Sequence, residues 1–360
     1  MKSLRVLLSG VVAVAMAFGF SPSTAQGQGS CAGDVNDDGV VSADDLAIVL
    51  SSWGSCPGKG SCAGDVNSDG MVSADDLAIV LSSWGSCPPI VPTWATLIEA
   101  LPDPAVVTDA TLRNAIIASG FAWRIRDNSS NIEMLLVPPG TFQMGCIMGS
   151  DLYICTLEER PVHTVTLTNA YYLGRYEVTQ AEWQAKMGSN PSYFTGQADS
   201  PSRPVEQVSW NTIQNFNSAT GLRLPTEAEW EFACRAGTTT PFHSGPGFPN
   251  GTTNDGLVGT FAWYESNSGG VTHAVGGKAA NALGMHDMLG NAFEWCSDWI
   301  GAYSSGAQTN PTGPGSGSAR VLRGGMWGDN TGFVRSSDRY FSTPGGGSAS
   351  TGFRVARTPS

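Results

Sequence analysis

The sequence predicts an α+β, loop-rich domain that follows a small all-α module. Three observations lead to this prediction. A segment of 26 residues occurs twice near the start of the chain, and each copy contains a helical pattern. From about residue 122, short strand-like runs alternate with brief helical patterns. Glycine and proline, at 45 and 21 residues, are typical of the long loops that must join these runs.

The composition indicates a folded protein of roughly two domains, since the chain has 360 residues. Charged residues make up only 14% of it, and there are 11 tryptophans, which is untypical of a disordered chain or a helical bundle. The formal net charge is −12 and no basic stripe occurs. We therefore expect no nucleic-acid partner.

The first 25 residues have the pattern of a signal peptide. Lys2 and Arg5 precede an apolar run over 6–20, and small residues follow at Ser23 and Ala25. The alternative is a membrane anchor, but the run is short for a bilayer span and no second one occurs. We expect an exported protein without a stable membrane span, located outside the cell, in the periplasm or at the cell surface.

The two copies, 31–56 and 62–87, differ at only two positions. Each has the D-x-N-x-D-G spacing of a calcium loop, in which hard oxygen ligands surround the ion. The expected ligands are Asp34, Asn36, Asp38, Val40 and Asp45 in the first copy and Asp65, Asn67, Asp69, Met71 and Asp76 in the second. Between residues 26 and 93, nine aspartates face a single lysine, so bound cations would favour folding. The alternative is an acidic linker without metal.

A helix is expected after each loop, with Leu46, Val49, Leu50 and Trp53 on one face in the first copy. No helix fits before either loop, and each loop closes on Asp rather than Glu. Residues 31–87 therefore resemble dockerin modules. This resemblance implies a docking partner, cohesin-like or other. Many dockerins read their partner with Ser-Thr at loop positions 10 and 11, where this chain has Ala-Asp.

Eight cysteines in an exported protein should mostly be paired. Cysteines flank both copies, so we expect one disulfide within each, worth roughly 3 kcal/mol for a closed loop of this size. A third pair is expected within a loop insertion, while the last two cysteines either bond or stay buried. The expected pairs are Cys31 with Cys56, Cys62 with Cys87, and Cys146 with Cys155; the last two cysteines are Cys234 and Cys296.

Residues 88–121 are expected to form a linker with short helices over 93–101 and 109–120. In the larger domain, 122–357, capping boxes begin two further helices. Thr179 with Glu182 begins one that stops at Gly188, and Thr226 with Glu229 begins one that stops at Gly237.

Seven motifs then stand in order: GTFQMG, PVHTVTLTNAYYLGRYEVTQAEW, PVEQVSW, GLRLPTEAEWEFACRAG, NALGMHDMLGNAFEWCSDW, RVLRGGMW and GFRVAR. Through them the domain resembles the formylglycine-generating enzyme, or sulfatase-modifying factor, family. The resemblance implies a fold similar to a C-type lectin domain. It also implies an oxidase that converts a sulfatase cysteine to formylglycine with copper held by two cysteines.

The copper pair is missing from this sequence. Its two positions fall on Asp329 and Val334, and no cysteine follows Cys296. Soft thiolates suit Cu(I), whereas a carboxylate is a hard ligand and valine is none. We therefore expect neither copper nor a catalytic centre. We expect instead a cleft near Trp327, Asp329, Arg335 and Arg339 that binds a peptide or glycan. The alternative function is the family's protein-modifying oxidation.

One family site is retained in HDMLGNAFEW, residues 286–295. The resemblance implies a structural calcium held by Asp287, Gly290, Ala292 and Glu294. Alternatively, Glu294 is a buried carboxylate held by backbone donors and an arginine. The sequence as a whole favours an exported, calcium-binding scaffold or binding protein that docks through its repeats.

Overall fold

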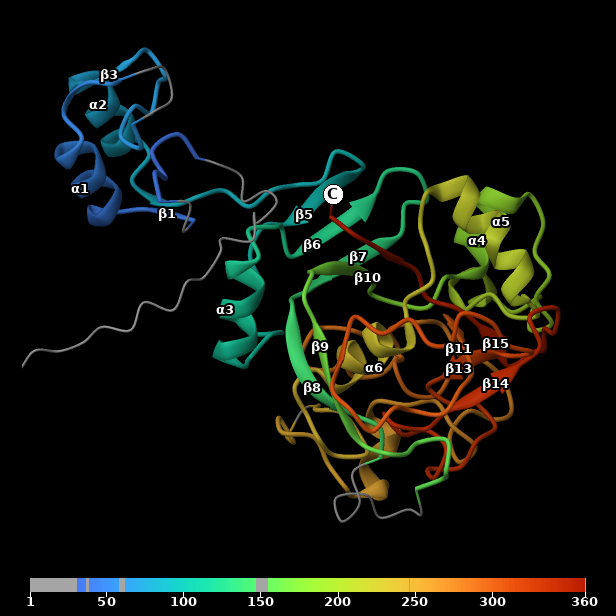
Figure 1. Ribbon diagram of the computed structural model, residues 1–360. Coiled ribbons are helices and arrows are strands. Elements are labelled where there is room, and N and C mark those ends of the chain that lie inside the picture. Colours follow the sequence, from blue (N-terminus) through green and yellow to red (C-terminus); the bar gives the residue numbers. More distant parts are fainter. Residues whose placement is uncertain (1–30, 37–38, 58–61, 147–154, 246, 360) are drawn as a thin grey trace, which may run out of the picture.

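The computed structural model describes residues 31–36, 39–57, 62–146, 155–245 and 247–359 (Figure 1). The predicted signal peptide and the ligand Asp38 lie outside these residues. Two hydrophobic cores, one built from the repeats and one from the rest of the chain, define a small module and a large domain. No helix in the described ranges is long and apolar enough to cross a bilayer.

The module consists of two loop–helix units that interlock. Strand β1 of the first copy pairs antiparallel with β4 of the second, and β2 pairs likewise with β3. Helices α1 and α2 pack together over four buried valines, Val41, Val49, Val72 and Val80. The elements are β1 Val40–Val41, α1 Ala43–Ser51, β2 Gly54–Ser55, β3 Met71–Val72, α2 Ala74–Ser82 and β4 Gly85–Ser86.

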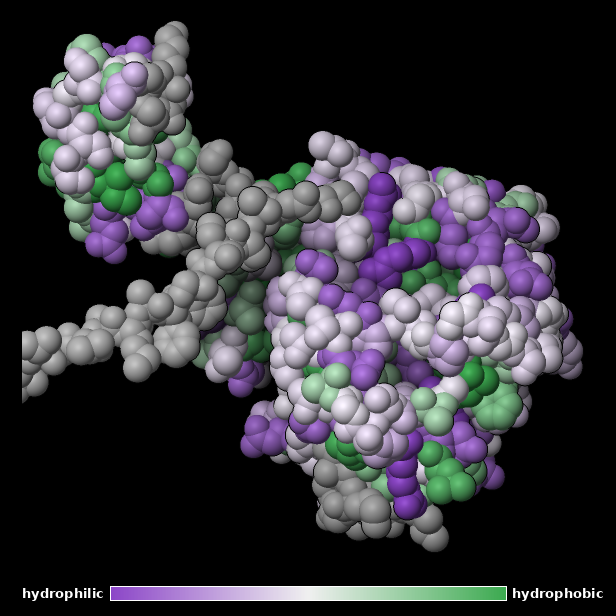
Figure 2. All heavy atoms as spheres, viewed as in Figure 1, coloured by the Kyte–Doolittle hydropathy of each residue, from purple (hydrophilic) through white to green (hydrophobic). Residues whose placement is uncertain are grey.

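The buried face of the first helix is narrower than the sequence predicted. Val49 is buried and Leu46 packs against the core, but Leu50 and Trp53 are each 52% exposed. A core built from only two short helices buries a single stripe of each, and residues beside that stripe face solvent. Figure 2 shows apolar side chains on the visible surface of the module.

The predicted disulfides within the copies are wrong. Cys31 pairs with Cys87, and Cys56 pairs with Cys62. The cross-copy strands explain this pairing, because the backbone N–H of Cys87 donates to Gly39 in the first copy. The two ends of the module are therefore adjacent and are tied together. The third pair, Cys146–Cys155, is confirmed, and Cys234 and Cys296 are buried free thiols.

The described residues of the large domain form three sheets of three or more strands. A five-stranded sheet has the order β16-β10-β7-β6-β5, a four-stranded sheet the order β14-β13-β11-β15, and a three-stranded sheet the order β12-β9-β8. The first consists of β5 Ala95–Glu99, β6 Arg124–Asp127, β7 Glu133–Val137, β10 Tyr171–Gly174 and β16 Ala356–Arg357. The others consist of β8 Gly140–Met144, β9 His163–Leu167, β11 Phe293–Trp299, β12 Gln308–Thr309, β13 Arg320–Arg323, β14 Tyr340–Ser342 and β15 Thr351–Gly352.

The expected first linker helix is a strand. Residues 95–99 form β5, which pairs antiparallel with β6 at the edge of the five-stranded sheet. β5 contains the β-branched residues Thr96 and Ile98, and pairing with β6 outweighs its weak helical pattern. The second expected helix is confirmed as α3, Ala110–Ala118, with Asp109 as its N-cap.

Helices α4 Gln180–Met187 and α5 Trp210–Thr220 pack against each other, whereas α6 Glu227–Arg235 is largely buried and contacts β8, β11 and β13. 3₁₀ turns occur at Ser200–Ser202 and Asp255–Thr260. Both predicted capping boxes are present, at Thr179 with Glu182 and at Thr226 with Glu229. α4 ends at Gly188 as predicted, whereas the left-handed residue that ends α6 is Ala236, one residue before Gly237. Three fully buried indoles, at Trp123, Trp230 and Trp295, anchor the loops to the core.

Candidate functional site

The second calcium loop is described in full, and its backbone is already wrapped around its carboxylates. Asp65 accepts hydrogen bonds from the N–H groups of Asp69 and Gly70, at 3.0 Å each. Asp76 accepts from Val66 at 2.8 Å and from Ser73 at 2.9 Å. These bonds hold both carboxylates against the backbone of the loop, and their roles as calcium ligands stay predictions.

The middle ligand, Asp69, points back along the loop. Its carboxylate accepts from the Asn67 side chain at 3.0 Å and from the Met71 N–H at 2.8 Å. Among the described residues, the carboxylates of Asp65, Asp69 and Asp76 do not form a group whose ligand atoms lie within 4.8 Å of each other. Like charges repel when no cation sits between them. This repulsion explains why the three carboxylates stay apart. Their oxygen atoms suit calcium, and a bound ion would require the Asp69 side chain to turn toward Asp65 and Asp76.

Cys31, Asp34 and Cys87 do form such a group, with their ligand atoms within 4.8 Å. Both sulfurs belong to one disulfide, so they cannot coordinate as thiolates. In the first loop, Asp34 accepts from Gly39, and Asp45 accepts from Val35 at 2.7 Å. This repeats the arrangement of the second loop.

The predicted calcium loop of the large domain follows a left-handed turn. Asp287 has φ 53° and Gly290 φ 78°. The Asp287 side chain is 2% exposed; its Oδ2 accepts from the Gly276 N–H at 2.6 Å, while its Oδ1 has no hydrogen-bond partner. An unpaired buried carboxylate oxygen is costly. This orphan oxygen fits a role as a metal ligand.

Glu294, the last predicted ligand of this loop, is held by an arginine. Arg354 donates to it at 2.7 and 3.0 Å, and the Trp230 indole N–H donates at 2.7 Å. All three side chains are buried. The ion-pair alternative for Glu294 is therefore present, and only further lone pairs of this carboxylate remain for a metal.

Glu177 is a third carboxylate at this loop that sequence reasoning missed. It is buried and accepts from the Ala292 N–H at 2.9 Å and from the Asn291 amide at 2.6 Å. Burial, and then the nearby Asp287 and Glu294 charges, raise the pKa of Glu177 well above its usual value. Burial also raises the pKa of Asp287 to about 6. Three carboxylates thus share one buried guanidinium, and a divalent cation would balance the remainder.

The loop supports the segment where the family holds copper. The Gly290 N–H donates to the Gly324 carbonyl at 2.8 Å, and the Trp327 N–H donates to the Asn291 carbonyl at 2.9 Å. Any ion that fixes this loop therefore also fixes the Gly324-Gly325 turn and the start of the predicted cleft.

The two residues predicted to stand at the copper positions offer no soft ligand. Val334 is fully buried, and Asp329 is partly buried, with its carboxylate accepting from the Met326 N–H at 3.0 Å. Burial raises the pKa of Asp329 to about 6. These two residues do not fit Cu(I).

Neither free thiol substitutes for the missing pair. Cys234 lies on α6 and Cys296 on β11, and both are fully buried rather than open to a substrate. Burial raises the pKa of Cys234 to about 12 and that of Cys296 well above its usual value. Both groups therefore stay as thiols, which are poor nucleophiles and poor metal ligands.

Two of the four residues predicted to line the ligand cleft face inward instead. Arg335 is 2% exposed and forms a two-pronged ion pair with Glu159, at 2.9 Å on each side. Arg339 forms a similar pair with Glu227, at 2.6 and 2.7 Å. A loop-rich core must pair such charges in order to bury them. Both arginines are therefore held in buried ion pairs, and sequence pattern alone does not distinguish them from surface arginines.

The other two, Trp327 and Asp329, remain near the surface. Trp327 donates its indole N–H to the Ala349 carbonyl at 3.2 Å and meets Phe194 edge to face at 5.5 Å. Phe194 in turn contacts Tyr193, which is 67% exposed. The surface next to Trp327 is therefore aromatic, without the positive charge that the sequence suggested.

The acidic residues of α6 are structural. Glu229 closes the capping box and pairs with Arg223 at 2.6 Å. Glu231 is fully buried and pairs with Arg235 and Arg323. With Glu227 bound to Arg339, none of the three is free for acid–base work.

Comparison with known proteins identifies both parts of the chain. Residues 123–359 match the model of the sulfatase-modifying factor enzyme 1-like domain, and residues 32–83 match the dockerin type I domain. The formylglycine-generating enzyme of Thermomonospora curvata is 34% identical over 195 residues, which are 51% of this chain and 63% of that enzyme. This chain thus spans less than two thirds of that relative.

Solved structures agree with the expected fold. Treponema denticola variable protein 1 is similar with a TM-score of 0.56 and 31% identity, over 63% of this chain and 95% of that protein. PvdO from Pseudomonas aeruginosa is similar with a TM-score of 0.53 and 27% identity, over 65% of this chain and 97% of that protein. The α+β, C-type-lectin-like fold of formylglycine-generating enzymes is thereby confirmed. The chain belongs to the sulfatase-modifying factor enzyme 1-like family and carries a dockerin type I module before that domain.

Proposed function

We propose that this chain is an exported, calcium-binding protein whose large domain binds or scaffolds other molecules and does not perform copper-dependent oxidation. The observation that carries the proposal is the pair of copper positions. One holds a fully buried valine, Val334, and the other a carboxylate, Asp329, that is bound to its own backbone turn. Cu(I) needs soft ligands, and the two remaining thiols are buried elsewhere.

Calcium would serve each region differently. In the module it would draw Asp69 into the second loop and offset a local surplus of aspartates. In the large domain Asp287 and Glu294 would hold it together with the backbone carbonyls of Gly290 and Ala292. The orphan Asp287 oxygen and the surplus of buried carboxylates support this second site.

The dockerin module would attach the domain to a protein partner, of the cohesin type or another. Exposed apolar side chains occur at equivalent places in the two copies, at Leu50 with Trp53 and at Leu81 with Trp84. They supply apolar contact area on a module that is otherwise acidic. The Ala-Asp pairs at loop positions 10 and 11 distinguish this surface from that of many dockerins.

The large domain would present its own ligand surface at Trp327 and Asp329. The exposed Tyr193 and the half-buried Phe194 extend it. Aromatic side chains of this kind bind peptide or glycan with little loss of side-chain entropy. Export, three disulfides and the acidic module all suit a role outside the cytoplasm.

The test is an oxidation assay on the full-length protein. Purified protein is incubated with copper(I), oxygen and a cysteine-containing sulfatase peptide, and the peptide is analysed by mass spectrometry for aldehyde. A formylglycine-generating enzyme serves as the positive control. The proposal expects an unchanged cysteine. Aldehyde formation would overturn it and establish the alternative, a protein-modifying oxidase, which family membership favours.

A further inference from the structure

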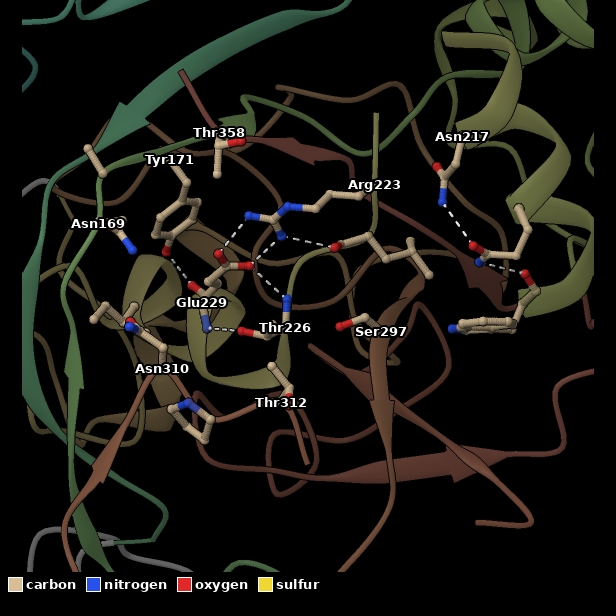
Figure 3. Close-up of a pocket in the computed structure, with 16 residues that line it drawn as sticks. Asn169, Tyr171, Asn217, Arg223, Thr226, Glu229, Ser297, Asn310, Thr312 and Thr358 are labelled. Carbon is tan, nitrogen blue, oxygen red and sulfur yellow. Dashed lines mark hydrogen bonds and ion pairs between the residues drawn. The ribbon is translucent and has the colours of Figure 1, made fainter. Parts of the chain in front are cut away.

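A cavity of about 370 Å³ lies on the large domain, lined by residues from α5, the start of α6 and the segment after β12 (Figure 3). Its lining includes Trp210 and Asn217 from α5, Tyr171 from the start of β10, and Asn310 and Thr312. None of these residues belongs to a calcium loop or to the predicted cleft. The volume is near the lower end of the ~300–1,000 Å³ typical of small-molecule sites.

One wall of this cavity contains an ion pair whose two charges compensate each other. Arg223 donates to Glu229 at 2.6 and 2.7 Å, and Glu229 also accepts from the Thr226 N–H at 2.8 Å. The Tyr171 hydroxyl donates to the Glu229 carbonyl at 2.6 Å. Figure 3 shows these contacts as one connected set. Because both charges are satisfied, the cavity attracts neither an anion nor a cation.

Uncommitted polar groups lie on the other walls. Asn217 is 8% exposed; its Nδ2 faces Gln214 at 3.5 Å, and its Oδ1 is buried without any hydrogen-bond partner. Within the described part of the chain, the side chains of Asn169 and Thr312 also make no hydrogen bond. A buried amide oxygen without a partner costs about 1–3 kcal/mol, so a ligand that supplies a donor there gains that amount.

An indole completes the cavity. Trp210 donates its N–H to the Cys296 carbonyl at 3.1 Å. The Arg320 guanidinium packs 3.9 Å from the Trp210 ring and 3.5 Å from the Trp299 ring, which fixes the indole in place. A rigid aromatic wall beside hydrogen-bonding amides suits a molecule with an apolar C–H face and a polar rim.

We infer that this cavity binds one ring of a neutral saccharide. Sugar hydroxyls donate and accept at once, as the free amide and hydroxyl groups require, and the ring C–H face fits the Trp210 indole. Because the ion pair is neutral overall, the cavity should bind charged sugars and other anions less well than neutral sugars. The compact volume suits a single ring better than an extended peptide.

Saturation-transfer NMR on the full-length protein tests this inference with four probes: the methyl glycosides of glucose, galactose, mannose and N-acetylglucosamine. At least one should receive saturation at its ring C–H protons. Asn217→Leu should weaken that binding about tenfold, the equivalent of one hydrogen bond. Because the change removes an unpaired buried oxygen, the variant should fold and melt at least as well as the parent.

Gln143→Leu, which replaces an exposed amide on β8 outside this cavity, is the matched control and should bind like the parent. No transfer to any of the four glycosides would overturn the inference. So would equal binding by Asn217→Leu and the parent, or preferred binding of glucuronate or a neutral tripeptide. Repeating the measurement with a chelator separates this outcome from that of the calcium proposal, since no calcium ligand lines the cavity.

Discussion

The module and the large domain keep loop-rich chain in one conformation by different means. The module has a core of four buried valines and two disulfides, and its buried aspartates, Asp34, Asp45, Asp65 and Asp76, accept hydrogen bonds from backbone N–H groups. The large domain has an extensive apolar core and buries charged side chains in pairs, among them Arg335 with Glu159 and Arg354 with Glu294. The difference indicates that size decides the strategy. A small module cannot bury enough apolar surface and relies on covalent links, whereas a large core can accommodate paired charges.

The largest effect is expected from breaking a buried pair in the large domain. Arg335→Met should destabilise it by about 3–5 kcal/mol, because Glu159 would remain buried without its partner. Arg203→Met is the matched control; its partner Asp199 has a side chain that is 42% exposed, so about 1 kcal/mol or less is expected. Denaturant unfolding measures both. If both variants lose equally little free energy of unfolding, Arg335 is not a buried structural residue and remains a candidate ligand-binding residue.

In the module the covalent links should matter nearly as much. Replacing Cys31 and Cys87 by serine opens a link with a sequence separation of 56, worth about 4 kcal/mol on the chain-entropy model. Replacing Cys56 and Cys62 opens one with a separation of 6, worth about 2 kcal/mol. Hydrogen exchange over residues 31–87 reports the two losses. A larger loss for the second pair would contradict the connectivity.

Buried acids give the large domain a pH dependence. Burial, and then the Glu227 charge, raise the pKa of Asp298 to about 7. The folded state therefore holds its proton more tightly than the unfolded state, so this contribution to stability is complete below pH ~4 and is lost as the pH rises through 7. In the parent, this loss lowers the free energy of unfolding by roughly 2–4 kcal/mol between pH 4 and 8, and Asp298→Asn should abolish it. If the melting temperature falls equally between pH 4 and 8 for parent and variant, this assignment is refuted.

Calcium should stabilise the module by about 3 kcal/mol at a hundredfold excess over its dissociation constant. Asp34→Ala and Asp65→Ala should each lose part of the effect, because each removes the first ligand of one loop. Asp44→Ala is the matched control, since Asp44 is exposed and precedes the closing ligand Asp45. Calorimetric titration measures the binding. If chelation changes neither hydrogen exchange nor melting of residues 31–87, the calcium loops are wrongly assigned.

Local patterns predicted local structure well. The repeat period, the capping boxes and the α3 cap at Asp109 depend on residues a few positions apart, and the structure confirms these caps. The disulfide pairing failed because it depends on strands that cross between the copies. β5 was missed because its only support is the neighbouring strand β6.

The candidate site shows the same limit. Asp287 and Glu294 lie in one motif and could be named from the sequence. Glu177 and Arg354 meet them from 110 and 60 or more residues away in the chain, in the motifs RYEVT and GFRVAR. Arg335 and Arg339 resemble surface residues until their partners Glu159 and Glu227 are placed beside them. Partners distant in sequence, not residue types, were the missing information.

Metal analysis of the full-length protein tests the central claim most directly. The protein, with its three disulfides intact, is loaded with calcium and with a preformed copper(I) complex that contains no thiol, and its bound metals are quantified per chain after gel filtration. Our account predicts bound calcium and copper at background level. One copper per chain that is released by thiol alkylation would contradict it, because Cys234 or Cys296 would then coordinate Cu(I), which Asp329 and Val334 cannot.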